Sequence, residues 1–248
     1  MKTVFALLLG IAVSCLSVVR VQAAAPAAAG KIRVLLTYGG HGFEEKPFFA
    51  MFDAMPDVQY TKAPMPKSAA LLKPGLEKDY DVVAMYDMVG KISPDQQKAF
   101  VELLQQGIGL VSFHHNMGAH RDWSEFAKII GAKYCMGAQQ IDGKKFGPSG
   151  YEHDQTINVT VADKEHPITR GLADFTIHDE VYNHYYVAPD VHVLLTTDNP
   201  KNDPKIAWVK EYGKSRVFYF MLGHDSQAWK NPAYPEILVR GIRWAASR

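Results

Sequence analysis

The chain has 248 residues, of which 47% are hydrophobic, and its formal net charge is only +1. This length and composition suit one globular domain with a sizeable core. A charge balance this close to neutral, without a basic run, excludes the electrostatic field that attracts nucleic acid or anionic lipid. The expected partner is therefore a neutral small molecule or another protein.

The first 23 residues have the pattern of a secretory signal peptide. Lys2 supplies the positive start, residues 4–19 are apolar but too short for a comfortable membrane span, and Val21-Gln22-Ala23 forms a small-residue cleavage site. Residues 24–30 are expected to form a flexible tether, and residues 31–248 the folded domain. We therefore expect an exported protein, periplasmic or secreted, that does not contact the membrane after cleavage.

Strands and helices alternate along the first half of the domain. Apolar runs predict strands at residues 31–37, 58–62, 80–86 and 110–113, and helical spacing predicts helices at 46–55, from Ser93 to Gly107, and at 121–130. The second helix starts with a capping-box pattern in Ser93, Pro94 and Gln96. This alternation predicts an α/β fold, a single domain with a mostly parallel central sheet flanked by helices.

The second half of the domain is richer in strands. Residues 137–150 predict a long surface excursion, and residues 232–246 predict the closing helix. Strands are expected at 155–162, 191–197, 205–210 and 216–222, the last two as a hairpin. This far side of the sheet can include antiparallel strands.

Polar residues follow three of the predicted strands directly. His41 comes after Gly39-Gly40, His114-His115-Asn116 follows the strand at 110–113, and His224-Asp225 follows the last strand. Parallel strands deliver their carboxyl ends to one edge of a sheet. We therefore expect His41, His115 and His224 to share one pocket with Glu180. His114 is expected to point into the packing, although the two adjacent imidazoles could be exchanged.

Residues 174–187 form a second polar stretch. If the segment is extended, His178, Glu180, Tyr182 and His184 share one face, because side chains alternate with a period of two. Two histidines that flank a carboxylate are typical of a metal site or an acid–base group. The alternative is the exposed polar face of an edge strand, with the tyrosines as packing residues.

Several short motifs, taken in order, resemble the ThuA-like family, which is associated with the utilisation of trehalose and related sugars. They are Gly39-Gly40-His41, Phe113-His114-His115, His166-Pro167-Ile168, Asp179-Glu180 with Tyr182, and Arg216-Val217-Phe218-Tyr219 leading to Gly223-His224. The resemblance implies a flavodoxin-like, class I glutamine-amidotransferase-like fold. Amidotransferases carry a nucleophilic Cys at the turn that His114-His115 fills here, and a Glu where Ser226 stands. Glutamine hydrolysis is therefore not expected.

Taken with the resemblance, the polar residues predict a carbohydrate-acting protein that uses His115, Glu180 and His224 in acid–base chemistry. Its substrate would be a disaccharide or a keto-sugar, and isomerisation, elimination and hydrolysis all stay open. Candidate substrate-binding residues are Gly40, His41, His114, Asn116, His178, Tyr182, His184, Asp225 and Trp229. A divalent metal such as zinc is a candidate cofactor, with His41, His115, Glu180 and His224 as its candidate ligands.

Two other functions stay open on the sequence. A non-catalytic sugar-binding protein would stack sugar rings on aromatic side chains, for which the candidates are Trp123, Tyr182, Tyr185, Tyr186 and Trp229. A third function is assembly with a sugar dehydrogenase, and a homo-oligomer is equally open. Turnover of a keto-disaccharide would separate the enzyme from both alternatives.

Overall fold

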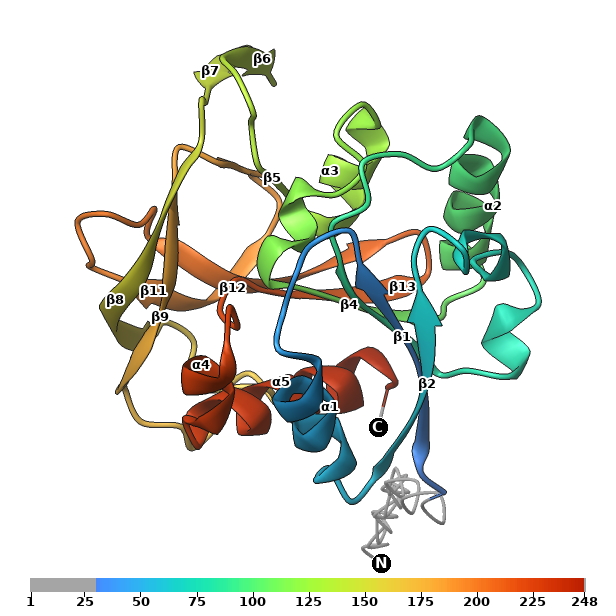
Figure 1. Ribbon diagram of the computed structural model, residues 1–248, viewed down its shortest axis with the longest axis horizontal. Coiled ribbons are helices and arrows are strands. Elements are labelled where there is room, and N and C mark those ends of the chain that lie inside the picture. The colour runs from blue at the N-terminus through green and yellow to red at the C-terminus, as the bar shows by residue number, and fades with distance from the viewer. Residues whose placement is uncertain (1–29, 248) are drawn as a thin grey trace, which may run out of the picture. The chain divides into compact units, whose positions relative to one another are not determined.

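The structure is a computed structural model that describes residues 30–247, so the predicted signal peptide and nearly all of the predicted tether lie outside the described residues. Its centre is a nine-stranded sheet in the spatial order β2-β1-β3-β4-β13-β12-β11-β8-β9 (Figure 1). These strands are β1 (Ile32–Gly39), β2 (Val58–Pro64), β3 (Val82–Asp87), β4 (Gly109–Phe113), β8 (Gly150–Val161), β9 (Phe175–Asn183), β11 (His192–Thr197), β12 (Lys205–Tyr212) and β13 (Ser215–Phe220).

The sheet has a parallel half and an antiparallel half. Strands β2, β1, β3, β4 and β13 pair in parallel, whereas β13, β12, β11, β8 and β9 pair antiparallel. The parallel half is covered on both faces, and accordingly every residue of β3 and β4 is buried. The predicted α/β class is confirmed, with the antiparallel strands on the far side of a mixed sheet. The predicted hairpin at 205–222 corresponds to β12 and β13.

Helices lie on both faces of the sheet (Figure 1). On one face are α1 (Glu45–Asp53), α4 (Ser226–Lys230) and α5 (Ala233–Ala245), and on the other are α2 (Pro94–Leu104) and α3 (Ser124–Ile130). The predicted capping box starts α2. The Ser93 hydroxyl accepts from the Gln96 backbone N–H at 3.2 Å, and the Gln96 side-chain oxygen accepts from the Ser93 N–H at 2.8 Å. None of the helices within residues 30–247 is long and apolar enough to cross a membrane.

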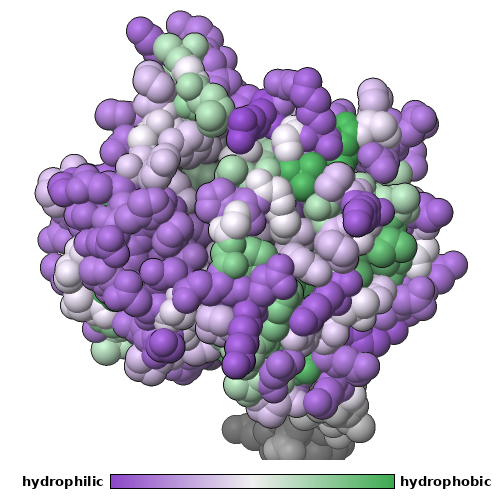
Figure 2. Space-filling model, in the orientation of Figure 1, coloured by the Kyte–Doolittle hydropathy of each residue, from purple (hydrophilic) through white to green (hydrophobic). Residues whose placement is uncertain are grey.

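Shorter elements decorate this frame. They are β5 (Ala132–Lys133), β6 (Gln139–Ile141), β7 (Lys144–Phe146), β10 (Tyr186–Val187) and the 3-10 helices η1 (Ala69–Leu71), η2 (Leu76–Lys78) and η3 (His114–Gly118). The predicted surface excursion contains the β6–β7 hairpin, which projects away from the sheet (Figure 1). Figure 2 shows a mainly hydrophilic surface on the β8–β9 side of this view, with apolar atoms gathered nearer the middle of the face.

Candidate functional site

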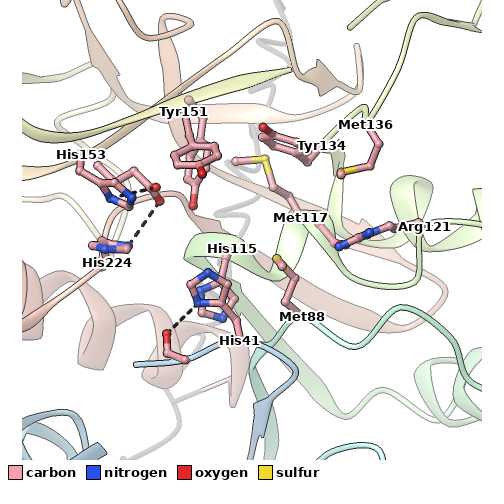
Figure 3. Close-up of a pocket in the computed structure, with 14 residues that line it drawn as sticks. His41, Met88, His115, Met117, Arg121, Tyr134, Met136, Tyr151, His153 and His224 are labelled. Carbon is pink, nitrogen blue, oxygen red and sulfur yellow. Dashed lines mark hydrogen bonds and ion pairs between the residues drawn. The ribbon is translucent and has the colours of Figure 1, made fainter. Parts of the chain in front are cut away.

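A cavity of about 510 Å³ lies beside the carboxyl ends of the parallel strands, where open α/β sheets bind ligands. Its lining comes from segments that are far apart in the chain, which the sheet topology brings to one edge (Figure 3). The lining residues are His41, Gly42, Met88, His115, Met117, Gly118, Arg121, Tyr134, Met136, Tyr151, His153, Glu180, Tyr182 and His224. The volume is within the range of small-molecule sites.

The turn after β4 carries two adjacent, buried imidazoles. His114 begins η3 with φ +52°, a left-handed conformation that is rare for a residue with a side chain. Its carbonyl accepts the Tyr219 hydroxyl at 2.7 Å, and its ring is fully buried. His115 instead lines the cavity. The two rings stay in contact, with their centroids 5.0 Å apart; His115 lines the cavity and His114 is buried beneath it.

Asn116 ties this turn to the neighbouring strand. Its side-chain oxygen accepts the Ser112 hydroxyl at 2.6 Å, and its side-chain nitrogen donates to the Asp87 carbonyl at 2.6 Å. Both polar ends of the buried amide are thus used within the protein. Asn116 holds the turn in place and does not line the cavity, contrary to the expectation that it binds substrate.

His115 and His41 form a pair at the cavity wall, with ring centroids 4.8 Å apart. Nε2 of His115 lies 2.9 Å from the Tyr86 carbonyl, which can only accept, so this nitrogen carries the proton of the neutral ring. Nδ1 has no partner within the described residues. Burial, with a smaller contribution from His41, lowers the pKa of His115 to about 3. His115 is therefore a neutral hydrogen-bonding group at ordinary pH.

Glu180 lies on β9 with imidazoles near both carboxylate oxygens. Its Oε1 is 3.3 Å from Nδ1 of His153, and its Oε2 is 3.4 Å from both Nε2 of His114 and Nδ1 of His224. The side chain is only 5% exposed. A carboxylate this buried needs partners that can donate or carry positive charge, and the rings of His153 and His224 can supply them.

A β-bulge brings His153 to Glu180. In the β8–β9 ladder, Glu152 faces Val181 and Gln155 faces Asp179, so two residues of β8 oppose Glu180 alone. Bulges of this kind re-aim a side chain and are frequent beside active sites. His153 was missed by sequence reasoning, because the register of two strands that are distant in sequence leaves no local pattern.

The turn after β13 positions His224. The buried Asp179 carboxylate accepts the backbone N–H groups of Glu180 at 2.8 Å, Gly223 at 2.6 Å and His224 at 2.9 Å. Burial raises the pKa of Asp179 to about 7, and the three N–H donors oppose that rise. The hydrogen bond to Glu180 raises the pKa of His224, and its partial burial opposes this.

The opposite wall of the cavity is mainly apolar and carries one charged side chain, Arg121. Its apolar part consists of the thioethers of Met88, Met117 and Met136 with the ring of Tyr134, and Figure 3 shows these side chains across from His153 and His224. The ring of Tyr151 lies beside His153, with 5.3 Å between their centroids. Tyr151 is 60% exposed and Met136 is 59% exposed, so both are available to a ligand at the rim. The cavity thus has a histidine and glutamate side and a side of tyrosine and methionine. No sequence periodicity marked this second side.

Of the sequence-predicted site residues, the structure places His41, His115, Glu180, Tyr182 and His224 around the cavity. Gly40 lies behind it, where an added Cβ would meet the Met88 backbone at 2.7 Å. The Asp225 carboxylate caps α4 by accepting from Gln227 and Ala228. Trp229 is buried and donates its indole N–H to the Gly223 carbonyl at 3.0 Å. These three residues shape the site without lining it.

The expected shared face of residues 178–184 requires correction. Strand β9 ends at Asn183, and His184 has φ +54°, so the alternation stops before it and its side chain is exposed. His178 is 40% exposed, and its Nε2 lies 3.5 Å from Asp154 rather than in the cavity. Of the aromatic residues expected to stack on a sugar, Tyr182 lines the cavity, whereas Trp123, Tyr185, Tyr186 and Trp229 do not.

The metal-type group also differs from the predicted ligand set. His114, Glu180 and His224 place one ligand atom each within 4.8 Å of one another. His41 and His115 do not belong to this group, although each has one ring nitrogen at a backbone carbonyl, Nδ1 of His41 at Gly42 and Nε2 of His115 at Tyr86, which leaves the other nitrogen free of that contact. Cys135 is buried elsewhere and is not among the residues that line the cavity.

Sheet and site together define a single α/β domain that carries a histidine- and glutamate-lined cavity at the carboxyl edge of its parallel strands. A family model named ThuA and described as trehalose utilisation matches residues 33–245. The chain belongs to the ThuA family, as its motifs predicted. A search of curated proteins finds no match.

Solved structures share the fold. A ThuA-like protein from Parabacteroides merdae is 21% identical with a TM-score of 0.73, and the match covers 88% of this chain and 90% of that one. A ThuA-like protein from Bacteroides uniformis is 23% identical with a TM-score of 0.65, and the match covers 90% of this chain and 94% of that one. A β-galactosidase from Bacillus circulans sp. alkalophilus is 11% identical with a TM-score of 0.55, and the match covers 87% of this chain but 31% of that one.

Proposed function

We propose that the cavity is a carbohydrate site and that its imidazoles and Glu180 transfer protons on a disaccharide or on an oxidised, keto derivative of one. The family description, trehalose utilisation, supports the substrate class. The observation that carries the proposal is the environment of Glu180. A buried carboxylate in contact with His114, His153 and His224 at the wall of an accessible cavity is suited to proton transfer.

The composition of the lining favours one reaction class. Glu180 is the single carboxylate among the cavity-lining residues that the structure describes. Glu152, an alternative partner, is exposed and paired with Lys201, and Asp225 caps a helix. Ordinary glycoside hydrolysis uses a pair of carboxylates that flank the scissile bond. Proton abstraction next to a keto group, leading to isomerisation or elimination, needs only one base and one acid, which Glu180 and the imidazoles can provide.

The two sides of the cavity suit the two kinds of surface on a sugar. Neutral His115 and the ring of His41 beside it can exchange hydrogen bonds with hydroxyl groups. The rings of Tyr134 and Tyr151 offer apolar faces for the C–H side of a pyranose. These two tyrosines take the stacking role that the sequence suggested for others. We also propose that the protein acts outside the cytoplasm, as its N-terminal pattern indicates.

Deuterium exchange tests this function. The mature protein is incubated in D₂O with trehalose or with its keto derivative, and products and C–H exchange next to the carbonyl are followed by NMR. We expect exchange or product from the keto-sugar, and we expect Glu180→Gln to lose it by a factor on the order of 100 or more. His178→Ala, an exposed histidine outside the cavity, is the matched control.

Other outcomes would assign the protein differently. Thermal stabilisation by the sugar without exchange or product would contradict the enzymatic proposal and identify a sugar-binding protein. Neither stabilisation nor exchange, together with co-purification of a sugar dehydrogenase, would identify an assembly partner. Both results would leave the fold and the family unchanged.

A further inference from the structure

Three ligand-type atoms form a nearly equilateral triangle beside the cavity. Nε2 of His114 lies 3.4 Å from Oε2 of Glu180 and 3.3 Å from Nδ1 of His224, and the third side, from His224 to Glu180, is 3.4 Å. The three residues come from the turn after β4, from β9 and from the turn after β13. Three polar side chains from separate segments that meet this closely need a common partner or a hydrogen-bond network to hold them together.

The size of the triangle matches a bound cation better than a hydrogen-bond network. Hydrogen bonds between N and O typically span about 2.9–3.0 Å. A tetrahedral ion whose N and O ligands lie about 2.0–2.2 Å away separates each pair of ligand atoms by about 3.3–3.6 Å. All three sides of the triangle fall within this second interval.

Hydrogen bonds from the remaining polar atoms of His114 and Glu180 orient these two side chains as metal ligands usually are. Nδ1 of His114 lies 3.1 Å from the Met221 carbonyl. The carbonyl can only accept, so Nδ1 carries the proton and the Nε2 lone pair points at the triangle. Metal-binding histidines commonly donate their other N–H to a backbone carbonyl in this way. His153 contacts the second oxygen of Glu180 and leaves Oε2 for the triangle.

Two corners of the triangle thus present lone pairs to each other. A carboxylate oxygen of Glu180 faces the unprotonated Nε2 of His114, and this arrangement is repulsive unless positive charge lies between them. Without a cation, Nε2 of His114 could instead accept a hydrogen bond from a protonated Nδ1 of His224, 3.3 Å away, or from the Tyr182 hydroxyl, 3.4 Å away. Both contacts are long for hydrogen bonds, whereas a cation would satisfy all three corners at once.

We propose that His114, Glu180 and His224 bind one divalent, zinc-like cation at the wall of the cavity. His114 lies fully buried beneath the site, whereas Glu180 and His224 line the cavity, so the fourth coordination position faces the ligand space. Three protein ligands with one open position are the arrangement of catalytic rather than structural zinc sites. The inference does not depend on the proposed substrate. Such a cation would supply Lewis-acid chemistry there; with Glu180 and His224 as its ligands, the proton-transfer role proposed for them in the metal-free site would pass to His153, which contacts Glu180.

The experiment uses tag-free mature protein that has been stripped of metal and titrated with Zn²⁺ by calorimetry. We expect stoichiometric binding, and a visible absorption of the strength typical of tetrahedral coordination when Co²⁺ replaces Zn²⁺. Glu180→Gln and His224→Ala should weaken Zn²⁺ binding by a factor on the order of 100 or more. His178→Ala should bind as the wild type does. Thermal unfolding without metal shows whether each variant is folded.

Three results would overturn the proposal. The first is wild-type protein that binds fewer than about one Zn²⁺ in ten chains. The second is a folded Glu180→Gln or His224→Ala variant with wild-type affinity. The third is loss of Zn²⁺ binding in His41→Ala with retention in His224→Ala, which would move the site to the His41–His115 pair. Zn²⁺ binding without sugar turnover would refute the proposed function alone, and metal-free turnover that resists chelation would refute the cation alone.

Discussion

The Asp179 carboxylate accepts the backbone N–H of His224 at 2.9 Å and so fixes a residue 45 positions away in the chain. The same carboxylate accepts from Gly223 and from Glu180. One buried side chain therefore sets the relative position of the turn after β13 and the segment of β9 that carries Glu180. Asp179 is a positioning residue, because it touches the backbone of both groups and does not line the cavity.

Asp179→Asn should disrupt this arrangement. An amide can accept at one oxygen only, so at least one of the three buried N–H groups loses its partner. Such a loss typically destabilises a protein by about 1–3 kcal/mol. Urea unfolding measures the effect, and binding of a ligand by the folded variant should weaken as well. Asp174→Asn is the control, because Asp174 accepts from one backbone N–H, that of Val161. Equal losses in the two variants would contradict the positioning role.

Gly40 allows the loop that carries His41 to approach the next strand. Its φ is +77°, and an added Cβ would lie 2.7 Å from the Met88 carbonyl. Gly171 has φ +76° with nothing within 4 Å of the same position. Both alanine variants incur the left-handed strain of about 1–2 kcal/mol. Gly40→Ala should also displace the backbone, unfold at a clearly lower temperature than Gly171→Ala and weaken ligand binding at the cavity. Identical melting curves would show that the loop can move aside.

Asp87 predicts a pH dependence of stability. Its carboxyl is fully buried, one oxygen accepts the Thr37 hydroxyl at 2.5 Å, and the other has no partner within the described residues. Burial raises the pKa of Asp87 to about 6 from the usual 3.8. The folded state therefore binds this proton more tightly than the unfolded chain does. Its stabilising contribution is complete below the unfolded pKa and is lost as pH rises through the folded one.

Between about pH 4 and pH 7, the free energy of unfolding of the wild type should fall by roughly 3 kcal/mol relative to Asp87→Asn. Urea unfolding of both proteins at several pH values measures this difference, because the pH dependence of every other group cancels. The absolute stability of Asp87→Asn is not informative, since its new N–H₂ group can lack an acceptor. Parallel pH profiles would show that Asp87 does not titrate in this interval.

The sequence predicted the parts of the site that lie at strand ends. His41, His115 and His224 each follow a parallel strand, and strand ends are visible as apolar runs that stop at polar residues. The capping box at Ser93 and Gln96 and the hairpin at residues 205–222 were predictable for a similar reason: each depends on residues that are close in the chain.

The parts of the site that were not predicted depend on how segments far apart in the chain pack against each other. His153 reaches Glu180 through the β8–β9 bulge, and His114 reaches Glu180 because its left-handed φ turns the ring beneath the cavity. His184 left the expected face because β9 ends one residue before it. Register, bulges and backbone handedness are decided by the packing of the whole sheet. A pattern of single residues could not indicate them.

Export is testable at the N-terminus. Because Lys2, the apolar residues 4–19 and Val21-Gln22-Ala23 have the order of a signal peptide, cleavage should leave a mature chain that starts near Ala24. Mass spectrometry of protein expressed with its native leader measures this mass directly. A variant with Ala23→Arg, which places a large charged residue at the cleavage site, should accumulate with its leader intact. A soluble cytosolic product that retains Met1 would contradict export.

Tyr151 gives the most direct test of the sugar-binding side of the cavity. Its ring is 60% exposed at the rim and makes an edge contact with His153, with 5.3 Å between centroids. Stacking of an aromatic ring is worth about 0.5–1.5 kcal/mol, so Tyr151→Ala should weaken sugar binding up to roughly tenfold. The melting temperature should change little, because an exposed ring contributes little burial.

Leu71→Ala is the matched control, since Leu71 is an exposed apolar residue, 48% accessible, that does not line the cavity. Isothermal titration with trehalose and with its keto derivative measures both variants. If Tyr151→Ala binds sugar as tightly as Leu71→Ala does, the tyrosine side of the cavity is not where the sugar ring lies.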